Sequence, residues 1–78
     1  MKNILVTGGC GFIASNFINY FLDKHQNYKI VNLDAMYYCA KEENIEEKIR
    51  TSNNYNFIKG SITNRELVNF ILTSHEID

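Results

Sequence analysis

The sequence has only two cysteines and no long hydrophobic run, and both shortages restrict the kind of protein it can be. Cys10 and Cys39 form neither a C-x-x-C pair nor a cysteine–histidine spacing, so no metal site is predicted. No apolar segment approaches the roughly 20 residues that cross a membrane, and the N-terminus runs directly into an expected strand without a secretory signal. We therefore expect reduced thiols, a cytoplasmic location and no membrane partner.

Charge of neither sign is in excess, which argues against a polyanionic partner. Eight basic and nine acidic residues give a net charge of −1, and no basic stripe is present, so nucleic acid is not expected as a partner. The 78 residues suffice for one small domain. A chain of this size buries only about 60% of the surface that it exposes when unfolded, so its core is expected to be marginal.

The stretch that organises the chain is the glycine-rich segment Val6–Ala14, which follows the apolar run Ile4–Val6 and leads into a helical pattern. Glycine adopts backbone angles closed to other residues, so the chain can reverse sharply at Gly8. Gly11 lets phosphate oxygens approach the backbone, and Ala14 is small enough for the helix to lie close to the strand. Because the first N–H groups of a helix lack intrahelical partners, this strand–turn–helix order predicts a cradle for a dinucleotide pyrophosphate.

An acidic residue stands at the distance that such a motif requires. Asp34 follows Ala14 by twenty positions and closes a second apolar run, Ile30–Leu33. Its carboxylate can accept hydrogen bonds from both adenosine ribose hydroxyls and repels a 2′-phosphate, so the sequence predicts NAD rather than NADP. The alternative is a glycine turn without a ligand and an ordinary exposed aspartate. It is disfavoured because the strand, the helix and the acid all occur in the required order.

Hydrophobic periodicity and turn residues predict alternating strands and helices. Strands are expected over 3–7, 29–34 and 55–59, and helices over 11–24, over a short surface segment within 41–50, and from a capping box at Thr63 and Glu66 through Leu72. In the first helix, two apolar rows are expected to pack against the sheet: Ile13, Phe17 and Phe21, and Ala14, Ile18 and Leu22. The predicted fold is α/β, the N-terminal portion of a Rossmann-type doubly wound parallel sheet with three strands, crossover helices and an incomplete sheet.

Several segments, spread over nearly the whole chain, carry a family resemblance: Thr7–Ser15, Val31–Asp34 with Tyr38–Ala40, Phe57–Gly60, Glu66–Val68 and His75–Asp78. In these segments the chain resembles the extended short-chain dehydrogenase/reductase family, and within it the nucleotide-sugar 4,6-dehydratases that act on UDP-glucose or dTDP-glucose. The second segment looks like the type found in plant rhamnose biosynthesis. The resemblance implies that residues 1–78 are the N-terminal part of an NAD-binding Rossmann domain, with the catalytic and substrate-binding parts absent.

The resemblance also implies a set of cofactor-binding residues. These are Gly8, Gly11, Phe12 and Ile13 at the pyrophosphate, Asp34 at the adenosine ribose, and Ser61 and Ile62 beside the adenine. Ser61 stands where the family usually has aspartate, so a charge-assisted bond to the adenine amino group, worth about 1 kcal/mol, is lost. Ala35 stands where the family often has lysine, which makes a 2′-phosphate still less favourable.

The resemblance implies an enzyme, although none of its catalytic residues lies in this chain. In the family, NAD takes a hydride from C4 of the sugar, water leaves across C5 and C6, and the hydride returns to C6. A tyrosine and a lysine in the pattern Tyr-x-x-x-Lys activate the C4 hydroxyl. Tyr37 and Lys41 have this spacing, but they directly follow the ribose aspartate on the adenosine side and could not reach the nicotinamide. We therefore do not expect them to be the catalytic pair. The family further implies a nucleotide-sugar substrate and, for a complete enzyme, a homodimer.

Two alternatives stay open at the level of sequence. The glycine turn and Asp34 serve nucleotide-sugar epimerases and decarboxylases of the same family equally well. The second alternative to a dehydratase is a non-catalytic nucleotide-binding module or a truncated remnant. The fourth strand of such a sheet would pair with the first, so its absence leaves Ile4–Val6 as an exposed apolar edge. We therefore expect these 78 residues to be a truncated piece.

Overall fold

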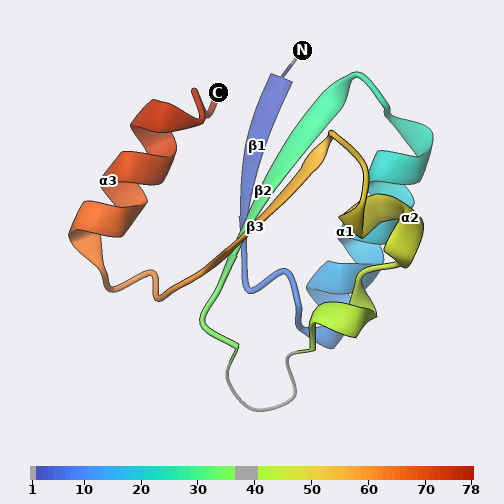
Figure 1. Cartoon of the computed structure of the whole chain (residues 1–78), viewed down its shortest axis with the longest axis horizontal. Coiled ribbons are helices and arrows are strands. Elements are labelled where there is room, and N and C mark those ends of the chain that lie inside the picture. Colours follow the sequence, from blue (N-terminus) through green and yellow to red (C-terminus); the bar gives the residue numbers. More distant parts are fainter. Residues whose placement is uncertain (1, 37–40) are drawn as a thin grey trace.

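The computed structural model describes residues 2–36 and 41–78, and it contains three strands and three α-helices in alternation within them (Figure 1). In chain order the elements are β1 (Lys2–Thr7), α1 (Phe12–Lys24), β2 (Tyr28–Asp34), the 3₁₀ turn η1 (Glu42–Asn44), α2 (Glu47–Arg50), β3 (Tyr55–Lys59) and α3 (Arg65–Ser74). The expected strand over 55–59 is confirmed, and the first two strands begin one residue earlier than expected.

The strands form one parallel sheet in the order β1-β2-β3. Ile4 of β1 is level with Ile30 of β2, and Ile30 is in turn level with Tyr55 of β3. The predicted α/β class and the three parallel strands with crossover helices are therefore confirmed. Because all strands point the same way, the loops that follow them lie at one edge of the sheet, the lower edge in Figure 1.

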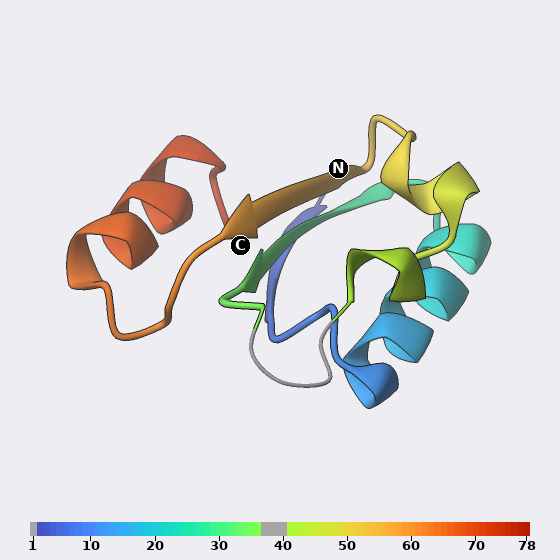
Figure 2. The ribbon, with the colours of Figure 1, turned by 60° about the horizontal axis from the view of Figure 1, so that its bottom comes forward.

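Helices cover both faces of the sheet, α1 and α2 on one side and α3 on the other (Figure 2). Side chains alternate across β2, so its successive residues enter two separate cores. The core under α1 and α2 consists of Ile18, Leu22, Ile30, Ile45, Ile49 and Tyr55. The core under α3 consists of Val31, Leu33 and Ile71. Burial on both faces explains why β2 is a nearly continuous apolar run.

The expected rows of α1 do not both reach the core. Ile18 and Leu22 are buried as expected, whereas Ile13 is 82% exposed and Phe17 is 46% exposed. Within the described residues β1 is an edge strand that pairs only with β2, so the row containing Phe17 has no further strand beneath it. The expectation that both rows are core was wrong for these two residues.

The edge strand itself is partly covered. Ile4–Val6 are half-buried rather than fully exposed. At the beginning of β1, the Asp78 N–H donates to the Asn3 carbonyl oxygen at 3.0 Å, and the Asn3 N–H donates to Asp78 Oδ2 at 2.7 Å. None of the helices in the described ranges is long and apolar enough to cross a membrane.

The charged segment after β2 is not one helix. Ile45 lies between η1 and α2 with extended backbone angles (φ −87°, ψ 126°) and a fully buried side chain. Asn19 of α1 binds the backbone on both sides of this interruption: its side-chain amide donates to the Asn44 carbonyl and accepts from the Glu46 N–H. A side chain of another helix thus occupies the backbone groups that a continuous helix would pair internally.

The predicted capping box at the start of α3 was wrong. Asn64 is the N-cap, and its Oδ1 accepts a hydrogen bond from the Leu67 N–H at 3.1 Å. The Thr63 hydroxyl lies 2.8 Å from Ser61 Oγ instead, and the Thr63 N–H donates to the same oxygen. Asparagine is at least as good an N-cap as threonine, and Thr63 is already engaged by the preceding turn.

Candidate functional site: a glycine turn facing a fixed carboxylate

The glycine turn leaves β1 at the carboxyl edge of the sheet. Gly8 has φ +67°, a left-handed conformation that favours glycine. Its N–H donates to the Leu33 carbonyl oxygen at 2.9 Å, and its own carbonyl accepts from the Gly11 N–H at 3.1 Å. The turn is therefore closed on itself and anchored to β2.

Helix α1 begins with its first N–H groups unengaged. Gly11 is the N-cap, and the first hydrogen bond of the helix runs from the Ser15 N–H to the Gly11 carbonyl at 2.9 Å. Over the described ranges, no group accepts from the N–H groups of Phe12, Ile13 or Ala14, and the first turn carries no acidic residue. The positive end of the helix dipole is therefore uncompensated and suits an anion.

The surface around this helix start is an open hollow of about 590 Å³. Its lining consists of Gly8, Gly11, Phe12, Ile13, Ala14 and Phe17. The structure thus brings together the four residues expected at the pyrophosphate. The apolar side chains of Phe12 and Ile13 are exposed and do not pack in the core. Their backbone N–H groups are at the start of the helix, beside this hollow.

Asp34 ends β2 beside the turn, and its carboxylate is held in one orientation. It is only 6% exposed. Oδ2 accepts from the Cys10 N–H at 2.8 Å, and Oδ1 accepts from the Met36 N–H at 2.7 Å. Met36 has φ +62°, which folds the chain back around the carboxylate. Each carboxylate oxygen has two acceptor sites, so Asp34 retains capacity for two ligand hydroxyls.

A second hollow of about 240 Å³ adjoins Asp34 and is mostly apolar. Its lining consists of Thr7, Gly8, Leu33, Asp34, Ala35, Gly60, Ser61 and Ile62. The residues expected at the ribose and the adenine therefore share one cavity, and Gly8 connects it to the hollow at the helix start.

Sequence reasoning assigned no role to the polar groups behind the turn. The Asn32 side chain on β2 contacts Gly9, Cys10 and Tyr55. Asn44 donates from its side chain to the Cys10 carbonyl at 2.8 Å. The available signal was an amide in the middle of the apolar run Ile30–Leu33, because a buried polar side chain needs partners.

Cys10 fills the variable position of the glycine motif and is a buried free thiol. Burial raises its pKa above the ordinary value, and the nearby Asp34 adds to this, while the hydrogen bond from Asn32 opposes it. In the described ranges no group of three side chains could hold a metal ion. Cys39, Tyr37 and the Tyr38–Ala40 part of the resemblance lie outside the described residues.

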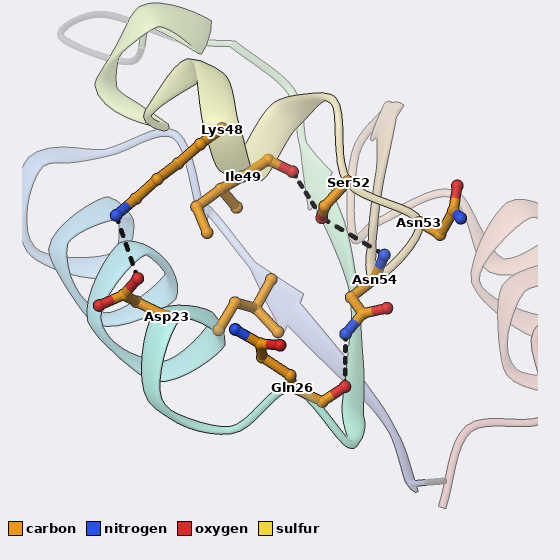
Figure 3. A pocket seen from close by; sticks show the side chains of 8 residues that line it. Asp23, Gln26, Lys48, Ile49, Ser52, Asn53 and Asn54 are labelled. Carbon is orange, nitrogen blue, oxygen red and sulfur yellow. Dashed lines mark hydrogen bonds and ion pairs between the residues drawn. The ribbon is translucent and has the colours of Figure 1, made fainter.

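A third hollow, of about 410 Å³, lies at the opposite edge of the sheet, where β2 and β3 begin (Figure 3). Several of its polar groups are engaged with one another. Lys48 Nζ lies 3.0 Å from Asp23 Oδ1, and Asn54 Nδ2 donates to the Gln26 carbonyl at 2.7 Å. This ion pair raises the pKa of Lys48 and lowers that of Asp23. None of the residues expected to bind the cofactor lines this hollow.

Comparison with known proteins gives the family. The family model for GDP-mannose 4,6 dehydratase matches residues 5–78. The chain belongs to this dehydratase family. The predicted resemblance to nucleotide-sugar 4,6-dehydratases is thereby confirmed.

Relatives of this dehydratase-family chain are much longer proteins. It is 44% identical over 77 residues to a trifunctional UDP-glucose 4,6-dehydratase/UDP-4-keto-6-deoxy-D-glucose 3,5-epimerase/UDP-4-keto-L-rhamnose-reductase of Arabidopsis thaliana, covering 99% of this chain and 11% of that protein. It is 43% identical over 77 residues to the human dTDP-D-glucose 4,6-dehydratase, covering 99% of this chain and 22% of that protein.

A solved structure shows the same arrangement of elements. The crystal structure of dTDP-glucose 4,6-dehydratase from Bacillus anthracis in complex with NAD matches the whole of this chain with a TM-score of 0.93 and 42% identity. The match covers 25% of that dehydratase. The predicted fold, the N-terminal portion of a Rossmann-type sheet, is therefore confirmed.

Proposed function

We propose that residues 1–78 form the N-terminal part of the NAD-binding domain of a nucleotide-sugar 4,6-dehydratase. The protein as a whole would convert a nucleoside-diphosphate glucose into its 4-keto-6-deoxy derivative. The observation that carries this proposal is the pairing of two features at one edge of the sheet. The first N–H groups of α1 are unengaged within the described residues, and the fixed Asp34 carboxylate stands beside them. The relatives that are named as dehydratases support it.

The diphosphate of NAD would lie against the start of α1. The N–H groups of Phe12 and Ile13 would donate to its oxygens, and Gly11 leaves the approach free of a side chain. Gly8 supplies the left-handed turn that puts this helix start in front of β1. These residues bind and orient the cofactor, and the helix dipole adds favourable potential for its negative charge.

The adenosine half would occupy the hollow beside Asp34. The carboxylate would accept hydrogen bonds from the two ribose hydroxyls, and its negative charge disfavours the 2′-phosphate of NADP. Ile62 would form an apolar wall for the adenine, and the Ser61 hydroxyl would accept from the adenine amino group. The crystal structure of the Bacillus anthracis relative in complex with NAD supports this assignment.

Bound NAD supplies a hydride acceptor for C4 of the sugar. We assign no catalytic residue to this chain, and the groups that act on the sugar would come from the rest of the protein. The substrate would be a UDP- or dTDP-sugar, and rhamnose biosynthesis is one route that would use the product. We further propose a cytoplasmic, homodimeric enzyme without nucleic-acid or membrane partners. The free Cys10 thiol is consistent with a reducing compartment.

Calorimetric titration of the 78-residue chain with NAD and NADP tests the cofactor assignment. We expect NAD to bind more tightly than NADP. Asp34→Asn removes the charge and leaves one acceptor oxygen for the two N–H groups of Cys10 and Met36, so it should weaken NAD binding at least about tenfold, the equivalent of one charged hydrogen bond. Asp23→Asn on the exposed side of α1 is the matched control and should bind NAD unchanged. NADP binding as tight as NAD binding would contradict the role of Asp34.

A further inference from the structure

A fully buried asparagine connects β2 to the glycine turn. Asn32 is 0% exposed and lies between two apolar residues of the central strand. All its hydrogen-bonding groups are used. Oδ1 accepts from the Gly9 N–H at 2.9 Å, and Nδ2 donates to the Tyr55 hydroxyl at 3.0 Å and to Cys10 Sγ at 3.3 Å. Burying an amide costs free energy that burying a hydrophobic side chain does not. The hydrogen bonds of Asn32 offset this cost.

The turn is shaped to receive this side chain. A Cβ at position 9 would collide with the Asn32 amide and with Ile18, so only glycine allows the backbone to lie this close. The next N–H, that of Cys10, is held by Asp34. Asn32 and Asp34 are alternate residues of β2 and share a face. Two consecutive N–H groups of the turn are therefore fixed by two side chains of one strand.

Tyr55 of β3 holds the asparagine from the other side. It is level with Ile30 in the sheet, so its ring lies on the same face as Asn32. Burial raises the pKa of Tyr55 to about 12, with a smaller opposing effect from the Asn32 hydrogen bond. The hydroxyl is therefore protonated at neutral pH and keeps a lone pair for the Asn32 N–H. The network thus links three segments: the glycine turn, the central strand β2 and the strand β3.

We propose that Asn32, held by Tyr55, is a positioning residue for cofactor binding. By fixing the Gly9 N–H it sets the orientation of the turn, and so the direction in which the first N–H groups of α1 point. This inference rests on the proposed function, because the benefit of that orientation is tighter binding of the dinucleotide diphosphate. Neither Asn32 nor Tyr55 contacts the two hollows that would hold NAD. Both therefore act through the backbone of the turn.

Tyr55→Phe is the main test, since it removes the hydroxyl and keeps the ring in the core. In the ligand-free, ¹⁵N-labelled chain we expect the Gly9 amide resonance to shift and its hydrogen exchange to accelerate. We expect the Kd for NAD to rise about fivefold, equivalent to about 1 kcal/mol, the typical value of one hydrogen bond. Tyr28→Phe removes the hydroxyl of the first residue of β2, for which no hydrogen bond is formed within the described residues, and is the matched control. It should leave both readouts unchanged.

A second pair of variants separates positioning from stability. Asn32→Leu should shift the Gly9 amide further and weaken NAD binding by more than tenfold. Ile71→Val weakens the core on the opposite face of the sheet, and it should lower the unfolding midpoint without changing NAD affinity. The inference is overturned if Tyr55→Phe leaves the Gly9 amide unchanged, or if Ile71→Val weakens NAD binding as much as Tyr55→Phe does.

The two proposals fail in different ways. If neither the 78-residue chain nor the whole protein that contains it binds NAD, the proposed function fails. The Gly9 resonance in the ligand-free variants still decides whether Asn32 and Tyr55 orient the turn. If NAD binds but the Gly9 amide resonance does not change in Tyr55→Phe, the positioning inference alone is overturned.

Discussion

Replacing Gly9 by alanine should disturb the site more than any other single methyl addition in the turn. The new Cβ would lie 2.5 Å from Asn32 Cγ and 2.6 Å from Ile18 Cδ1, closer than real Cβ contacts, so the neighbours must move. Overpacking of this kind costs about 1–3 kcal/mol. Displacing the Asn32 amide also breaks its buried bond to the Gly9 N–H, about 1 kcal/mol more. We expect a loss of about 2–4 kcal/mol in the free energy of unfolding.

Denaturant unfolding of the chain measures this loss, and two further variants test its cause. Gly60→Ala is the matched control, because its Cβ would clash only with the flexible end of Leu67 and would meet Leu33 Cδ1 at an ordinary contact distance of 3.4 Å, so the loss should stay below about 1 kcal/mol. In the double variant Gly9→Ala/Asn32→Ala, the shortened side chain leaves room for the methyl group. The two losses should therefore be less than additive. A Gly9→Ala chain as stable as the unaltered one, or strict additivity, would refute the steric argument.

Two other predictions concern Tyr55 and the start of α3. Because the folded state raises the pKa of Tyr55 from 10.0 to about 12, its contribution to stability is fully present below pH 10 and is lost as the pH rises to 12. That loss is about 2 kcal/mol, and unfolding curves from pH 9 to 12 should show it in the unaltered chain but not in Tyr55→Phe. At the second site, Asn64→Ala should cost about 1 kcal/mol and Thr63→Ala much less. Equal losses on thermal unfolding would restore Thr63 as the cap.

The position of the site could be predicted from sequence because its determinants are local. A glycine is required where φ is positive, as at Gly8, and the switch from an apolar run to helical spacing marks the end of a strand. Asp34 could be placed because it closes the next apolar run, and parallel strands bring their carboxyl ends to one edge. Each of these inferences depends on a few neighbouring residues and on a general rule of chain geometry.

What the sequence could not supply are pairings between residues that lie far apart along the chain. Asn19 of α1 binds the backbone of Asn44 and Glu46, where the segment 41–50 departs from a single helix. The exposure of Phe17 depends on which strands lie beneath its helix. In each case a local pattern allowed several outcomes of similar energy, and a contact with another element selected one.

By itself, then, the sequence determined the order of strands and helices, the glycine turn and the carboxylate at the end of β2. Periodicity and special backbone angles are properties of short segments, so they can be read without coordinates. Only the tertiary structure decided that Asn32 joins the turn to Tyr55 and that Asp34 is held by two backbone N–H groups. Hydrogen bonds of this kind depend on the separation and direction of atoms on different elements, which are set when the helices and strands pack together.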